Sequence, residues 1–377
     1  MSWNSILKSA FAKSAIGIAA LSVAVGAQAG SNGVRVTVVP EKAALGASDD
    51  VHVNVTLTNT SSSPQYVLKW RTPFEGLSAP LFDITRDGAK VPYTGALIKR
   101  ARPTQADYYL LKPGASHTVK VELSALYDLS VTGDYAIRYR AASPDLFLGK
   151  QNRIGDAGAA AASSAAGDIG RLESETASLY IDGRLPRGSN SPIIEALKRG
   201  DGGTPPAPAG LSYTNCTASQ QSTVASAVSA AKTMSNSSVT YMAKTTMGPR
   251  YTKWFGTVTS TRQATVKANF TAIKDGFDNK NVVVDCGCKQ SYYAYVYPTQ
   301  PYKIYVCRAF WNAPMTGTDS KGGTLVHEMS HFDVVAGTDD TVYGQSGAAS
   351  LAISDPNKAV ANADNHEYFA ENTPALN

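Results

Sequence analysis

The chain has 377 residues, which is enough for two domains of roughly 100 to 200 residues each. Hydrophobic residues make up 43% of it and charged residues only 17%, so it can bury real cores and lacks the composition of a disordered chain. The net charge of +5 is spread over both halves, and neither half is basic enough to predict binding to nucleic acid or to a membrane surface.

The first 29 residues have the pattern of an export signal. Lys8 and Lys13 precede an apolar run at 15–25, and the small-residue site Ala27-Gln28-Ala29 follows it. A membrane anchor is the alternative, but the run is far shorter than the ~20 apolar residues that a span needs, and no later segment reaches that length. We therefore expect a signal peptide at 1–29 and a secreted mature protein with no membrane segment.

The N-terminal half alternates apolar and polar residues with a period of two. The clearest runs lie at 34–38, 51–57, 119–123 and 135–139. Turn signals rich in Gly, Pro and Asp separate them. This pattern predicts an all-β sandwich over residues 30–184, immunoglobulin-like although the Cys and Trp hallmarks of antibody domains are absent, with a mobile Ala/Gly/Ser loop at 156–167.

A linker rich in Pro, Gly and Ser follows at 185–210 and marks the domain boundary. Lys198 and Arg199 lie just before its Gly/Pro stretch. Because a basic pair in an exposed linker is accessible to proteases, we expect a processing site here.

Past the linker the apolar period becomes helical, which predicts a mainly helical α+β domain over 211–377. Thr217 and Gln220 form a capping-box pattern at the start of a first helix. A second helical stretch is expected roughly from 250 to 273, and a hairpin from the alternating runs at 292–298 and 303–308. Five apolar residues of the second stretch are expected in the core: Trp254, Phe255, Val258, Val266 and Phe270.

The four cysteines all lie in this second domain, at Cys216, Cys286, Cys288 and Cys307. In an exported chain an even number predicts two disulfides. A four-cysteine zinc site is the alternative, but its usual signature is a pair of C-x-x-C knuckles, and here there is one C-x-C. Because adjacent C-x-C residues cannot bridge each other without strain, each should pair with a distant cysteine, in an order that the spacing leaves open.

The residues with the clearest chemistry are His327, Glu328 and His331, which form an H-E-x-x-H motif. On a helix, residues four apart share a face, so the two imidazoles can bind one metal while Glu328 acts on a metal-bound water. Two ordinary core or surface histidines are the alternative. With only five histidines in the chain, a chance match is expected in roughly a few per thousand such sequences, so we predict one Zn²⁺ per chain.

The third metal ligand is not part of that motif. The metzincin extension would require Gly at position 334 and His at position 337, and these are Val334 and Gly337. Asp333, two residues past the second histidine, points to another side of the helix. Gly337 can end the helix and reverse the chain, which would bring Asp339 or Asp340 toward the metal.

The segment from Gly337 to Gly344, G-T-D-D-T-V-Y-G, resembles the G-T-x-D-x-x-Y-G signature of the aspzincins, the deuterolysin family of zinc endopeptidases. The resemblance extends from Tyr213 to Asn377, and no motif position departs from the pattern. It implies a zincin-type catalytic domain with zinc ligands His327, His331 and Asp340, general base Glu328, and Tyr343 as the hydroxyl that supports the oxyanion. It also implies the disulfides Cys216–Cys286 and Cys288–Cys307.

The segment 362–372 is similar to the peptidyl-Lys metalloendopeptidase branch of that family, in which acidic side chains line the pocket for the residue after the scissile bond. Asp364 and Glu367 are three apart, so on a helix they share a face and can hold an ammonium group. A solvated helix surface is the alternative. His366 has no assigned role, and we expect it to be a packing residue.

The resemblance also implies that the N-terminal half is a propeptide, because deuterolysin-like enzymes are made as exported precursors. A permanent carbohydrate- or protein-binding module is the competing interpretation. A basic side chain of the propeptide would be able to fill the acidic pocket and inhibit the enzyme. A Lys-directed enzyme would be able to process itself at Lys198, and a foreign protease cutting at Arg199 is the alternative.

Together with the family resemblance, which implies the propeptide and the cleavage before Lys, the sequence predicts a secreted, monomeric zinc endopeptidase that is inhibited by its own propeptide and cleaves peptides before Lys. A broad-specificity deuterolysin-like protease is the first alternative. A secreted binding or toxin-like protein with a structural zinc is the second, and it would require a fourth ligand such as Asp339 or Asp333.

Overall fold

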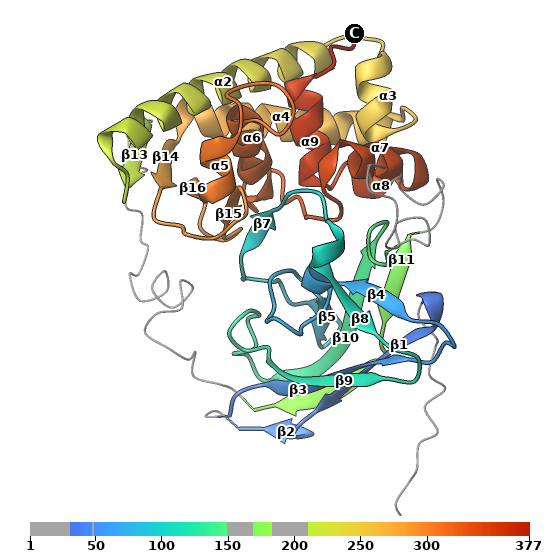
Figure 1. The fold of residues 1–377 in the computed structure, drawn as a ribbon. Helices are drawn as coiled ribbons and strands as arrows, with labels where there is room; N and C mark the ends of the chain where they lie inside the picture. The colour runs from blue at the N-terminus through green and yellow to red at the C-terminus, as the bar shows by residue number, and fades with distance from the viewer. Residues whose placement is uncertain (1–30, 47–48, 149–168, 183–209) are drawn as a thin grey trace, which may run out of the picture.

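The computed structural model describes residues 31–46, 49–148, 169–182 and 210–377, which form a β-rich N-terminal half and a mainly helical C-terminal half, each with its own hydrophobic core (Figure 1). The expected signal peptide, the expected loop at 156–167 and the expected processing residues Lys198 and Arg199 lie outside the described residues.

The described residues of the N-terminal half form strands arranged in three sheets. They are β1 (Val34–Pro40), β2 (Ala44–Leu45), β3 (His52–Asn59), β4 (Gln65–Leu68), β5 (Phe82–Arg86), β6 (Ala89–Lys90), β8 (Tyr108–Leu111), β9 (Ser116–Glu122), β10 (Gly133–Ser143), β11 (Gly170–Glu173) and β12 (Ala177–Ile181), with 3-10 turns η1 (Ser31–Gly33), η2 (Lys69–Arg71) and η3 (Gln105–Asp107). The first sheet has the order β1-β3-β9, and the second has the order β2-β12-β10-β5-β6 with β11 also paired to β10. The third is the ribbon β4-β8.

The expected period of two is visible in β3, where Val53, Val55 and Leu57 are buried and the residues between them are partly exposed. Alternate side chains of a strand point to opposite faces, so this strand places one apolar face in the core. The all-β character predicted for this half is therefore confirmed, and the immunoglobulin-like topology stays a prediction.

The C-terminal half packs helices against one mixed sheet. Its elements are β13 (Gly210–Thr214), α2 (Ala218–Met242), α3 (Pro249–Phe255), α4 (Ser260–Asn279), β14 (Asn281–Asp285), β15 (Ala294–Val296), β16 (Lys303–Val306), α5 (Arg308–Asn312), α6 (Lys321–His331), α7 (Gly344–Ser354), α8 (Pro356–Ala359) and α9 (Ala363–Glu371). The capping box predicted at Thr217 starts α2, because Gln220 N donates to Thr217 Oγ1 and Thr217 N donates to Gln220 Oε1. Helices α2, α4 and α9 pack around α6.

The helix expected over 250–273 is two helices, α3 and α4. Gly256, at φ +72°, ends α3, and Thr259 starts α4 by accepting a hydrogen bond from Arg262 N. A side chain at Gly256 would also meet the Ala352 carbonyl. The assignment of Val258 to the core is therefore wrong, since it lies in the connection and is 37% exposed, whereas the other four apolar residues named for this stretch are buried.

The predicted hairpin is confirmed as β15 and β16, which pair antiparallel. The structure forms the disulfides Cys216–Cys286 and Cys288–Cys307, which is the pairing that the family resemblance implies. The first disulfide joins the segment between β13 and α2 to the end of β14, and the second joins the segment after β14 to the end of β16. Both disulfides therefore fix the sheet on which α6 rests.

Strand β7 (Leu97–Lys99) comes from the N-terminal half of the sequence but pairs with the sheet of the C-terminal half. That sheet has the order β13-β14-β16-β15-β7, and β7 runs antiparallel to β15 at its edge. In Figure 1, β7 lies between the β-rich half and the side of the helical half that faces it. No sequence pattern predicts a strand here, because three residues are too few to show a period.

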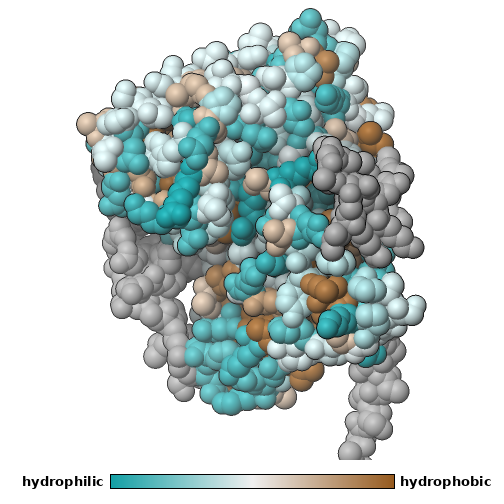
Figure 2. Space-filling view, in the orientation of Figure 1, coloured by the Kyte–Doolittle hydropathy of each residue, from teal (hydrophilic) through white to brown (hydrophobic). Residues whose placement is uncertain are grey.

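No helix among the described residues has the length and apolar character that a membrane crossing requires. On the face drawn in Figure 2, the most hydrophobic residues form separate patches with hydrophilic residues between them.

Candidate metal centre and acidic pocket

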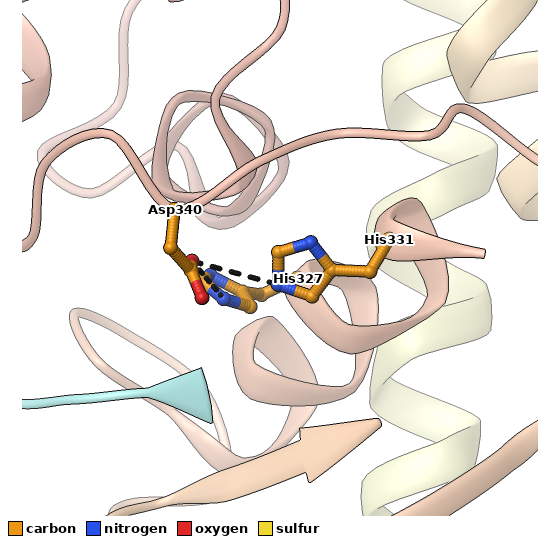
Figure 3. Close-up of side chains that lie close together, drawn as sticks. All are labelled: His327, His331 and Asp340. Carbon is orange, nitrogen blue, oxygen red and sulfur yellow. Dashed lines mark ion pairs between the residues drawn. The ribbon is translucent and has the colours of Figure 1, made fainter. Parts of the chain in front are cut away.

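Helix α6 presents His327 and His331 on one side, toward Asp340 of the segment that follows (Figure 3). Ser320 starts the helix, since its Oγ accepts from Gly323 N at 2.9 Å. The helix ends at His331 and not at Gly337 as expected. Gly337 lies at φ +56° in the turn that reverses the chain, so it supplies the predicted reversal in a different place.

Two sets of hydrogen bonds fix the segment that carries Asp340. Thr338 N donates to Ser330 O at 3.1 Å, which ties the segment back to α6. The Asn362 side-chain oxygen accepts from Thr341 N at 2.7 Å and from Val342 N at 3.1 Å. Asn362 belongs to the C-terminal segment quoted in the sequence analysis, but no sequence signal assigned it this role.

The geometry of His327, His331 and Asp340 fits a bound cation. Asp340 Oδ1 lies 3.1 Å from His327 Nε2 and 3.5 Å from His331 Nε2, and all three side chains are buried. None of these three atoms has a hydrogen-bond partner among the described residues. His331 Nδ1 donates to Thr338 O at 2.7 Å, which leaves the lone pair of Nε2 free for a metal. Two imidazole nitrogens and one carboxylate oxygen are a common ligand set for zinc.

Electrostatics favours an ionised Asp340. Burial alone would raise its pKa, but His331 and His327 outweigh burial and hold the pKa of the Asp340 carboxyl well below its usual value. The position suits a carboxylate ligand.

Glu328 and Tyr343 lie next to the three candidate ligands. Both are buried, and neither carboxylate oxygen of Glu328 has a hydrogen-bond partner among the described residues. Burial raises the pKa of Glu328 to about 7, although His327 and His331 act to lower it. Such a carboxyl group can take up and release a proton near neutral pH. The Tyr343 hydroxyl donates to Ile98 O at 2.7 Å, so it points toward a backbone carbonyl of β7.

Asp364 and Glu367 lie on one face of α9 and are both fully buried. The alternative of a solvated helix surface is therefore wrong. Their carboxylates receive a lysine side chain, because Lys99 Nζ lies 2.5 Å from Glu367 Oε2 and 3.4 Å from Asp364 Oδ1. Burial acts to lower the pKa of Lys99, but Asp364, Glu367 and Asp319 outweigh it and hold that pKa well above its usual range.

No sequence pattern points to the other side chains around this ammonium group. Asp319 Oδ1 lies 3.9 Å from Lys99 Nζ and accepts from the Tyr368 hydroxyl at 2.6 Å. The rings of Tyr293 and Tyr368 lie with their centroids 5.2 and 5.9 Å from the same nitrogen. We call the five residues around the Lys99 ammonium group the acidic pocket: Asp319, Tyr293, Tyr368, Asp364 and Glu367.

The acidic pocket also touches the candidate metal centre. Asp364 Oδ1 lies 2.8 Å from His327 Nδ1, on the side of the imidazole opposite Nε2. Asp364 Oδ2 accepts from Gly344 N at 2.6 Å. Asp364 can therefore orient the His327 ring as well as bind an ammonium group.

Asp333 and Asp339, the candidate fourth ligands of a structural zinc, are exposed. Among the described residues, the groups placed to hold a metal are His327, His331 and Asp340, and His327, Asp364 and Glu367, and neither group includes Asp333 or Asp339. They line a cavity of about 510 Å³ that also borders His331. His366 packs against the rings of Phe255 and Phe270, as expected for a packing residue, and burial lowers its pKa to about 4.

Comparison with known proteins finds the aspzincin family pattern, described as lysine-specific metallo-endopeptidase, at residues 240–371. An extracellular protease of Aeromonas hydrophila is 48% identical over 334 residues, which are 88% of this chain and 91% of that protein. A peptidyl-Lys metalloendopeptidase of Armillaria mellea is 37% identical over 339 residues, 87% and 88% of the two chains. A solved zinc peptidase from Grifola frondosa is 49% identical and covers 43% of this chain and 100% of its own, with a TM-score of 0.42.

Proposed function

The chain belongs to the aspzincin family of metalloendopeptidases, and on that premise we propose that it is a secreted zinc endopeptidase, made as an inactive precursor, that cleaves peptide bonds on the N-terminal side of lysine. The observation that carries the specificity is the buried Asp364–Glu367 pair with the ammonium group of Lys99 between them.

His327, His331 and Asp340 would hold the zinc, because their three ligand atoms converge without other partners. Bound there, zinc would polarise the substrate carbonyl and lower the pKa of a water molecule. Glu328 is the proposed general base, which takes a proton from the attacking water and delivers it to the leaving amine. The Tyr343 hydroxyl would donate to the carbonyl oxygen as negative charge develops on it.

The acidic pocket favours lysine over arginine. Two carboxylates with 2.5 and 3.4 Å contacts to one nitrogen suit the compact point charge of an ammonium group. The longer, planar guanidinium of arginine needs acceptor oxygens in a different, bidentate arrangement. A broad-specificity protease has no need for two buried carboxylates at this place, and a structural zinc would require a fourth ligand, so neither alternative explains the site as well.

A matched set of peptides tests this function. Three peptides that differ only in having Lys, Arg or Ala after the scissile bond are given to the processed, zinc-loaded enzyme. We expect kcat/KM for the Lys peptide to exceed that for the Ala peptide by roughly 100-fold or more. This is the size of the loss in binding when one partner of a buried charge pair is removed. Equal rates on all three peptides would reject the Lys specificity, and no cleavage of any of them would reject the peptidase assignment for this site.

We further propose a precursor of four parts: a signal peptide at 1–29, a β-sandwich propeptide at 30–184, a linker at 185–210 and a catalytic domain at 211–377. The propeptide acts as an intramolecular inhibitor of a monomeric enzyme. Strand β13 begins at Gly210 and pairs in parallel with β14, so a cut at Lys198 or Arg199 would keep β13 in the catalytic domain.

The processing route gives a separate prediction. If activation is autocatalytic, the purified Glu328→Ala precursor should keep its linker indefinitely, and a trace of active enzyme should cut it in front of Lys198. Intact mass and N-terminal sequencing report both results. Maturation of the inactive variant alone, with the same new N-terminus, would rule out self-processing and favour a foreign protease at Arg199.

A further inference from the structure

The backbone of β7 is bound in the way that extended peptides bind a sheet edge. Leu97, Ile98 and Lys99 lie opposite Val296, Tyr295 and Ala294 of β15, in antiparallel register. Tyr293 N also donates to Lys99 O at 3.1 Å. The segment thus completes the catalytic sheet, although it comes from the other half of the chain.

The side chain of Lys99 is buried in the acidic pocket. Its ammonium nitrogen contacts both buried carboxylates, and its side chain is only 1% exposed. Burying a lysine is unfavourable unless its charge is paired, and the same is true of the two carboxylates. Lysine and pocket therefore compensate each other, and removing the lysine would take the ammonium partner away from two buried acids.

The peptide bond that precedes Lys99 lies at the candidate catalytic groups. Ile98 O accepts from the Tyr343 hydroxyl at 2.7 Å, and Ile98 N donates to Asp340 Oδ2 at 3.1 Å. In Figure 3 the teal end of β7 lies beside the three candidate ligands. A bond before a lysine, with its carbonyl at the proposed oxyanion hydroxyl, has the position of the bond that a Lys-directed enzyme cleaves.

Arg100, the basic residue that follows Lys99, does not lie in the acidic pocket. The guanidinium of Arg100 lies over the rings of Trp70 and Tyr292, 5.1 Å from each centroid.

Arg71 of the β-rich half also contacts the catalytic domain. Its Nη2 donates to the carbonyl oxygens of Asp340 and Thr341. The β-rich half therefore contacts the segment that carries Asp340 through Arg71 and occupies the acidic pocket through Lys99.

We propose that β7 is the inhibitory segment of the precursor: it occupies the substrate cleft in the register of a bound substrate, with Lys99 in the lysine pocket. This inference rests on the proposed function and specifies how the same site is regulated. Hydrolysis between Ile98 and Lys99 would not vacate the cleft by itself, because the pairing with β15 holds one new end and the acidic pocket holds the other. Latency therefore depends on occupancy of the pocket by Lys99.

The test uses the full-length, zinc-loaded precursor with its linker verified as intact by mass spectrometry. Wild type, Lys99→Ala and the control Lys112→Ala, which changes an exposed lysine in a turn of the same half, are compared on a quenched peptide containing one lysine. We expect Lys99→Ala to raise the rate of peptide cleavage at least tenfold and Lys112→Ala to match wild type. Tenfold is the lower end of the affinity lost when a buried charge pair in a complex is broken.

A second readout does not depend on catalysis. In precursors that carry Glu328→Ala, binding of a fluorescent lysine peptide is measured by anisotropy. The peptide should bind when Lys99→Ala is also present and should be excluded when Lys99 is kept. If Lys99→Ala does not fold, the peptide of residues 95–102 is added to processed enzyme instead. It should inhibit, and the same peptide with Ala in place of its lysine should inhibit at least tenfold more weakly.

The outcomes separate the two proposals. If processed enzyme cleaves before lysine but the Lys99→Ala precursor stays as inactive as wild type and excludes the peptide, the inhibitory role of β7 is wrong and the proposed function stands. If processed enzyme does not cleave before lysine, the proposed function fails, and the anisotropy measurement still decides whether Lys99 fills the pocket. Equal inhibition by the two synthetic peptides would also overturn the role of Lys99.

Discussion

Replacing Glu328 with Ala should lower the rate of peptide hydrolysis by roughly 10²- to 10⁴-fold, the usual contribution of a positioned general base. The zinc content should stay at one ion per chain, because Glu328 contributes no atom to the group formed by His327, His331 and Asp340. Kinetics on a lysine peptide and metal analysis of the same sample measure both quantities. Glu328→Gln keeps the side-chain volume and should show the same loss.

Asp340→Ala is the contrasting variant. It removes the oxygen on which both imidazole nitrogens converge, so we expect loss of zinc together with loss of activity. Asp275→Ala changes a half-buried aspartate of α4 that belongs to neither the candidate metal centre nor the acidic pocket, and it serves as the control for both measurements. Hydrolysis at the parental rate by Glu328→Ala would refute the proposed base, and stoichiometric zinc in Asp340→Ala would refute the ligand assignment.

The acidic pocket gives the second large effect, and its two carboxylates should behave differently. Glu367→Gln should lower kcat/KM for a lysine peptide by roughly 100-fold, because the contact of 2.5 Å loses its charge inside a buried site. Zinc content should remain close to that of the wild type, since Glu367 Oε2 lies 3.3 Å from His327 Nδ1 and Asp364 Oδ1 is the nearer acceptor at 2.8 Å.

Asp364→Asn should affect both specificity and metal. Its carboxylate faces His327 Nδ1, and removal of such a partner of a metal-binding histidine typically weakens metal affinity by about 10- to 100-fold. A zinc titration of the two processed variants beside wild type distinguishes them. Unchanged lysine preference in the Glu367→Gln, Asp364→Asn double variant would place the specificity pocket elsewhere in the protein.

The sequence identifies the parts of the site whose spacing is local. His327 and His331 are one helical turn apart, and the segment to Tyr343 carries a family signature, so pattern and resemblance together name the candidate ligands and catalytic groups. Asp364 and Glu367 are likewise one turn apart. The structure gathers all of these residues around α6 and α9, where a periodic pattern is a sufficient guide.

The remainder of the site depends on contacts between residues that are distant in sequence. Lys99 meets Asp364 and Glu367 from more than 260 positions away, and Asp319 joins them from a turn that has no periodic pattern. Strand β7 has three residues, too short for alternation to show, and its partner β15 lies in the other half. The break at Gly256 was missed for a related reason, because apolar spacing on both sides of it continues the helical period.

The central claim is that one site combines zinc-dependent hydrolysis with recognition of lysine. The most direct measurement is digestion of a mixed peptide library by the processed protein, with mass spectrometry of the new termini, before and after removal of zinc by a chelator and its restoration. We expect new N-termini that begin with lysine, their loss on chelation and their return with zinc. Cleavage without preference for lysine, or cleavage that persists after zinc is removed, would refute the proposed lysine-specific zinc site.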